Sequence, residues 1–165
     1  EETTTMVLIP QVRRATTLPL IAAGGIASGE AMLAAEAVGA EGVQCGTVFA
    51  MSRESSAADA FKDRCASLQE GDTMLCLKKL APTRMIKNPL YDEIKTAEDN
   101  GADAEALRGI LGKAASKRGI FEGDLDRGEL EIGQVASAVK EIQTAAQIVE
   151  RMMGEYADAR KRILG

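Results

Sequence analysis

The sequence predicts an α/β domain in which short buried strands alternate with helices along a parallel sheet. Two apolar runs of strand length, residues 20–23 and 42–47, flank a helix expected at residues 28–38. Strand, helix and strand within about 30 residues form a βαβ unit. Aromatic residues make up only 3% of the 165 residues. The core is therefore expected to consist of aliphatic side chains, a composition that suits an α/β protein better than a β-sandwich.

The elements of this unit follow from local signals. A short helix is expected at residues 10–15, with Pro10 in its first turn, where a missing N–H costs nothing. The run at residues 20–23 is apolar throughout, which predicts a strand buried on both faces of a parallel sheet. Ser28 is the expected N-cap of the next helix, and Gly39 lies just beyond its end.

The pattern changes after Ser52. We expect a loop between Pro82 and Pro89, and residues 73–80 fit either a strand or an extended excursion. The other expected elements are helices at residues 57–68, 91–98, 104–117, 130–140 and 144–164, with a turn-rich connector at 119–128. The last helix has one apolar stripe, which we expect to pack on the rest of the protein. Its members are Ala145, Val149, Met152, Tyr156, Ala159 and Ile163.

Composition excludes several classes of function. The net charge is −5 and no segment concentrates Lys and Arg in the way that phosphate-backbone binding requires. No apolar run approaches the roughly 20 residues of a membrane span, and the cysteines lack the paired spacing of metal or redox sites. We expect a soluble cytoplasmic protein without nucleic-acid or membrane partners and without a metal. The sequence has no histidine, so any imidazole chemistry has to come from elsewhere.

Glycine turns follow both strands of the βαβ unit. Gly24-Gly25 ends the first strand and Gly46-Thr47 ends the second, and ligands bind at this edge of parallel sheets. We expect the helix starting at Ser28 and the turn after Gly46 to offer unpaired amides and a partial positive charge of about +0.5 to a phosphate. The alternative is a pair of tight βα turns without a ligand. The Gly-Gly-x-x-x-Gly order is not the Rossmann fingerprint.

Residues 20–29 (LIAAGGIASG) and 39–49 (GAEGVQCGTVF) resemble the hallmark pair of the nitronate monooxygenase (2-nitropropane dioxygenase-like) family. This family includes the FMN-dependent enoyl-acyl-carrier-protein reductases. Residues 83–88, which end in Lys-Asn, and residues 123–128 and 133–137 resemble the reductase branch. The resemblance covers nearly the whole chain in order.

The resemblance implies the C-terminal portion of a (β/α)8 TIM barrel, with its last two strands and helices and a helical C-terminal extension. Three parts are then expected. Residues 1–52 form the C-terminal βαβ part of the FMN-binding barrel, residues 53–128 a cap-like insertion, and residues 129–165 helices that pack back on the barrel.

The resemblance also implies an FMN cofactor, with NADH or NADPH as electron donor. Gly133 and Gln134 are candidates for the flavin or substrate pocket. We interpret Cys45 as a small residue beside the cofactor rather than as a redox thiol. The residues expected to hold FMN are Ala23, Gly24, Gly25, Gln44, Cys45, Gly46 and Thr47.

The family's catalytic histidine lies in a segment before the position that Glu1 occupies, so no catalytic residue is expected in this chain. The resemblance therefore implies a chain that is inactive by itself and needs a missing N-terminal barrel half. Three functions stay open. The first is enoyl-thioester reduction on an acyl carrier protein in fatty-acid synthesis, the second is nitronate oxidation, and the third is a non-catalytic fragment or subunit. The family also implies that the parent protein is a homo-oligomer.

Overall fold

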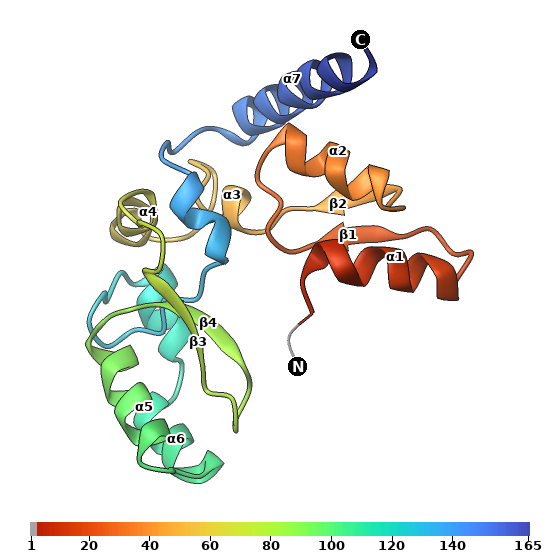
Figure 1. Cartoon of the computed structure of the whole chain (residues 1–165). Helices are drawn as coiled ribbons and strands as arrows, with labels where there is room; N and C mark the ends of the chain where they lie inside the picture. The colour runs from red at the N-terminus through yellow and green to blue at the C-terminus, as the bar shows by residue number, and fades with distance from the viewer. Residues whose placement is uncertain (1–2) are drawn as a thin grey trace. The chain divides into compact units, whose positions relative to one another are not determined.

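The computed structural model describes residues 3–165, which form two compact units (Figure 1). The first unit holds the chain up to Arg53 together with Gln143–Gly165, and the second holds Glu54–Ile142. The boundaries predicted from the sequence lie between residues 52 and 53 and between residues 128 and 129. The chain leaves and re-enters the first unit at neighbouring points, because the N–H of Arg53 donates to the carbonyl of Gln143 at 3.0 Å.

The first unit contains the expected βαβ arrangement. Strands β1 and β2 pair in parallel, with Ile21 opposite Gly42 and Ala23 opposite Gln44. The Ser28 hydroxyl caps α2 by accepting from the Ala31 N–H at 3.3 Å, as predicted. The elements are α1 (Thr5–Ala15), β1 (Ile21–Ala23), α2 (Gly29–Ala37), β2 (Gly42–Gln44), α3 (Thr47–Ala50) and α7 (Ala145–Leu164).

One prediction for this unit is wrong, and another is met on one face of the sheet only. Helix α1 begins at Thr5, so Pro10 lies inside it and costs an intrahelical hydrogen bond to the carbonyl of Met6. Strand β1 is not buried on both faces: Ala22 is buried, whereas Ile21 is 56% exposed and Ala23 is exposed. Alternate side chains point to opposite faces of a strand. In the described part of the chain, one face of this two-stranded sheet is therefore open.

The second unit is built around an antiparallel hairpin. Strand β3 pairs with β4 from Thr73 opposite Ile86 to Cys76 opposite Thr83. Its apolar core includes Met85 of β4 and Leu107 of α6, both fully buried. The elements are α4 (Asp59–Ala66), β3 (Thr73–Cys76), β4 (Thr83–Ile86), α5 (Pro89–Asp99), α6 (Ala104–Leu111), a π-helical turn (Lys117–Phe121) and a 3-10 helix (Gln134–Ala138).

Here too the structure departs from the sequence pattern. The segment expected to be a loop between Pro82 and Pro89 contains β4. The helix expected at residues 130–140 is absent, because Leu130 and Ile132 extend along β4. The Ile86 N–H donates to Leu130 O at 2.9 Å, and the Ile132 N–H donates to Arg84 O at 3.3 Å. Only the 3-10 helix remains of the predicted helix.

Helix α6 also ends earlier than the predicted residue 117. Gly112 terminates it with a positive φ of 71°, a conformation that glycine adopts readily.

Helix α7 starts as predicted and buries part of the predicted stripe. Thr144 and Gln147 form a reciprocal capping box at its first turn. Its buried side chains are Ile148, Met152 and Ala159, whereas Val149 and Ile163, two members of the predicted stripe, are exposed. No helix within residues 3–165 combines the length and apolarity that a membrane span requires.

Candidate cofactor-binding site

The two glycine turns lie next to each other at one edge of the parallel sheet. The pairing of Ala23 with Gln44 aligns the ends of β1 and β2, so Gly24-Gly25 and Cys45-Gly46 follow at the same edge (Figure 1). Of the residues expected to hold FMN, the exposed ones are Ala23, Gly24, Gly25, Gln44 and Gly46. The structure thus brings the predicted barrel residues together and leaves their backbone accessible.

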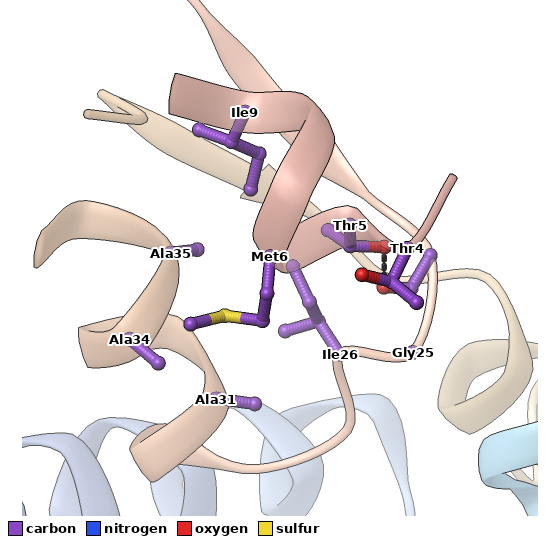
Figure 2. A pocket seen from close by; sticks show the side chains of 10 residues that line it. Thr4, Thr5, Met6, Ile9, Gly25, Ile26, Ala31, Ala34 and Ala35 are labelled. Carbon is purple, nitrogen blue, oxygen red and sulfur yellow. Dashed lines mark hydrogen bonds between the residues drawn. The ribbon is translucent and has the colours of Figure 1, made fainter. Parts of the chain in front are cut away.

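The backbone of Gly24 and Gly25 adopts conformations that other residues rarely take, with φ values of 102° and 73°. A Cβ placed on Gly25 or on Gly46 would meet no atom within 4 Å. A group can therefore approach both backbones closely. The Thr5 hydroxyl holds the turn from one side by donating to the Gly24 carbonyl at 3.0 Å (Figure 2).

The second turn leads into the short helix α3. Gly46 is its N-cap, and the first intrahelical hydrogen bond runs from the Ala50 N–H to the Gly46 carbonyl at 2.9 Å. The amides of Thr47, Val48 and Phe49 consequently have no acceptor inside the helix. Such amides carry a partial positive charge that suits an anion.

The predicted contribution of α2 to this cradle is wrong, because its first amides are already paired. The Gly29 N–H donates to Glu155 Oε2 of α7 at 2.9 Å, and the Ala31 N–H donates to Ser28. The backbone amide of Glu30 bonds its own carboxylate, and this bond, together with that from Ser28, lowers the pKa of Glu30. The N-terminal end of α2 thus binds a carboxylate of α7. The candidate phosphate cradle consists of the two glycine turns alone.

A comparison with protein families shows to which family a chain with these two glycine turns belongs. The sequence model of the family described as "Nitronate monooxygenase" matches residues 1–155. The chain belongs to the nitronate monooxygenase family.

Two solved structures that are similar to this chain have the same fold. FabK from Thermotoga maritima is 36% identical with a TM-score of 0.93, and the match covers 100% of this chain and 52% of FabK. Nitroalkane oxidase from Streptomyces ansochromogenes is 31% identical with a TM-score of 0.75, covering 96% of this chain and 45% of that one. The predicted fold is confirmed: the chain is α/β and corresponds to part of a TIM barrel with a helical C-terminal part.

Curated relatives agree on the family. A Staphylococcus aureus protein named "Probable nitronate monooxygenase" is 36% identical over 124 residues, which cover 72% of this chain and 34% of that protein. The chain spans about half the length of the relatives it matches, or less.

An apolar groove of about 290 Å³ adjoins the first glycine turn in this family member (Figure 2). It lies between the start of α1 and the side of α2 that carries Ala31, Ala34 and Ala35, with Met6 and Ile26 among the residues that line it. Apart from Thr4, Thr5 and the glycine turn itself, the lining of this groove is apolar.

The cysteines of this nitronate monooxygenase family member are poor nucleophiles. Cys45, at the candidate site, is half-buried, and burial raises its pKa, which keeps the thiol protonated near neutral pH. Cys65 and Cys76 belong to the second unit, where burial raises the pKa of each to about 12.

The remaining predicted residues, Gly133 and Gln134, lie in the second unit. Gly133 is the N-cap of the 3-10 helix, and Gln134 is its exposed first residue. Their approach to a flavin or a substrate stays a prediction.

Asn88, from the Lys-Asn motif, has a structural role that the sequence did not reveal. Its Oδ1 caps α5 by accepting from the Tyr91 N–H at 2.9 Å. Its Nδ2 donates to the carbonyls of Leu125 and Gly128 at 2.8 and 2.9 Å. Asn88 is buried, whereas Lys87 is exposed. The backbone N–H of Lys87 donates to the Asp72 carbonyl at 2.9 Å, so both residues of the pair are held to the second unit, but only the side chain of Asn88 is buried there.

Proposed function

We propose that the chain carries the phosphate-binding part of an FMN site and that the whole protein is an NAD(P)H-dependent enoyl-acyl-carrier-protein reductase. The observation that supports the cofactor is the pair of glycine turns, side by side, with open space beside Gly25 and Gly46. A phosphate is the group that such turns accommodate without a lysine.

The residues of the chain fit this cofactor in distinct ways. The amides of Gly25 and Gly46 would hold the phosphate, because a ligand can reach the backbone where no side chain intervenes. Thr47 is buried at the start of α3, and its amide would be a third donor. Ala23 and Gln44 would line the approach at the exposed strand ends. When bound, FMN would supply the hydride chemistry. Binding and orientation are the tasks left to these residues.

The likeness to FabK supports the reductase, because it covers the whole chain at 36% identity and a TM-score of 0.93. Nitronate oxidation is the second candidate. The family description, the S. aureus relative and the nitroalkane oxidase likeness at a TM-score of 0.75 favour it.

We further propose that the chain alone binds flavin without turnover. Its sequence contains no histidine, and protonation of the substrate would need a general acid from the remaining part of a barrel about twice this size. A separately expressed N-terminal half, mixed with this chain, should then restore turnover. Activity of the chain by itself would contradict this proposal.

The test of the reaction uses the full-length protein with its flavin reduced anaerobically. Mixing it with a short enoyl thioester should reoxidise the flavin rapidly, as followed by absorbance. In a parallel cuvette, the oxidised protein is mixed with a nitronate. Reduction of the flavin by the nitronate, with no reoxidation by the enoyl thioester, would replace the reductase by nitronate oxidation.

A further inference from the structure

The C-terminal helix holds the start of α2 in close contact. Helices α2 and α7 pack side by side (Figure 1). A Cβ on Gly29 would lie 2.0 Å from the Tyr156 N and 2.3 Å from the Met152 carbonyl oxygen. Glycine is therefore required at this point, because any side chain would force the two backbones apart.

Two half-buried charged residues of α7 bind the segment that follows Gly24-Gly25. Glu155 accepts from the Gly29 N–H at 2.9 Å and pairs with Arg151 at 2.8 Å; their side chains are 29% and 30% exposed. The Arg151 guanidinium also lies 3.4 Å from the Ala27 carbonyl, to which both of its terminal nitrogens donate. Gln143, just before α7, accepts from Arg151 Nε at 3.0 Å.

The glycine turn between these anchors has little rigidity of its own. Gly24 and Gly25 both have positive φ, and glycine restricts the backbone least of all residues. Thr5 fixes the Gly24 carbonyl on one side of the turn. Arg151 and Glu155 fix Ala27 and Gly29 on the other side. The contacts made by α7 thus begin two residues after Gly25, at Ala27.

We propose that Arg151 and Glu155 are positioning residues that set the geometry of the Gly24-Gly25 turn, so that affinity for the phosphate of the cofactor depends on the C-terminal helix. This inference rests on the proposed function, since it assigns the phosphate to that turn. Neither residue touches the cofactor: they act through the backbone at Ala27 and Gly29.

The test compares FMN with riboflavin, which lacks the phosphate. Full-length apoprotein is titrated with each flavin, and flavin fluorescence reports binding. We expect Glu155→Ala to weaken FMN binding about tenfold, the effect of losing one charge-assisted hydrogen bond. Riboflavin binding should stay within about twofold of the wild type, because the contacts to the ring are retained.

Two further variants sharpen the result. Glu155→Gln keeps an oxygen for the Gly29 N–H but loses the ion pair with Arg151, so it should weaken FMN binding less than Glu155→Ala. It also provides a folded variant if the alanine change prevents folding. Glu150→Gln removes an exposed carboxylate from the same helix and should leave both affinities unchanged.

Each outcome decides the matter. A selective loss of FMN affinity supports the proposal. An equal loss of affinity for FMN and for riboflavin would mean that Arg151 and Glu155 have a purely structural role. An unchanged FMN affinity would mean that they have no role in binding. If the wild-type protein bound FMN no more tightly than riboflavin, the proposed phosphate site itself would fail, and this inference with it.

Discussion

Replacing Gly29 by alanine should destabilise the protein, although alanine is the better helix former. The added Cβ would lie 2.0 Å from the Tyr156 N and 2.6 Å from the Glu155 carbonyl carbon, both backbone atoms that cannot rotate away. Ordinary contact needs about 3.5–4.0 Å between carbon atoms, so α7 has to move by more than 1 Å. That movement also breaks the hydrogen bond from the Gly29 N–H to Glu155.

The magnitude follows from these contacts. Overpacking costs roughly 1–3 kcal/mol, and a lost hydrogen bond to a charged group costs roughly 1.5–3 kcal/mol. The helix propensity of alanine returns up to about 1 kcal/mol. We therefore expect Gly29→Ala to lower the free energy of unfolding by about 3 kcal/mol.

The matched control is Gly154→Ala in α7, where a Cβ would meet nothing within 4 Å. This variant should raise the free energy of unfolding by about 0.5–1 kcal/mol. Urea unfolding of the full-length protein, followed by circular dichroism, measures both. With a slope of about 2 kcal/mol/M, the Gly29→Ala midpoint should fall by about 1.5 M. A Gly29→Ala midpoint at or above that of the wild type would refute the close contact of α2 with α7.

Three other changes test the site and the second unit. Gly46 has a negative φ and open space around it, so Gly46→Ala should change the free energy of unfolding by no more than about 0.5 kcal/mol. Its FMN affinity should fall at least tenfold in a fluorescence titration. An unchanged affinity would remove Gly46 from the site. Asn88→Ala leaves two carbonyls of the second unit without their donor and should cost about 2–4 kcal/mol in urea unfolding, whereas a near-neutral effect would show that water replaces the amide. Cys65 and Cys76, with pKa values raised from 9.0 to about 12, should resist iodoacetamide at pH 8 until the protein is unfolded, as read by mass spectrometry. The same pKa shifts stabilise the folded protein below pH 9. This stabilisation should be lost between about pH 9 and 12, because the thiols of the unfolded chain lose their protons first. A free energy of unfolding that stays constant between pH 9 and 12 would contradict the burial of these thiols.

The βαβ unit could be predicted because its signals are local. An apolar run, the N-cap Ser28 and the glycines after each strand all lie within the unit that they specify. Neighbouring parallel strands then bring Gly25 and Gly46 to one edge by the geometry of the connection alone.

Several errors occurred where a distant segment decides the structure. Residues 83–86 and 130–132 form neighbouring extended segments, and neither shows its partner in its own pattern. The α2 amide at Gly29 looked available for phosphate because its acceptor, Glu155, lies 126 residues further along the chain. On α7 the predicted stripe contained the buried Met152 and Ala159 but missed the buried Ile148.

This long separation has a consequence for synthesis on the ribosome. A ribosome adds about 5–20 residues per second, so roughly 6–25 s pass between the synthesis of Gly29 and that of Glu155, 126 residues later. During that interval the ribosome synthesises residues 54–142, which make up the second unit, while α2 still lacks its partner helix. All residues of the second unit are therefore joined to the chain before the first unit has the helix that completes it.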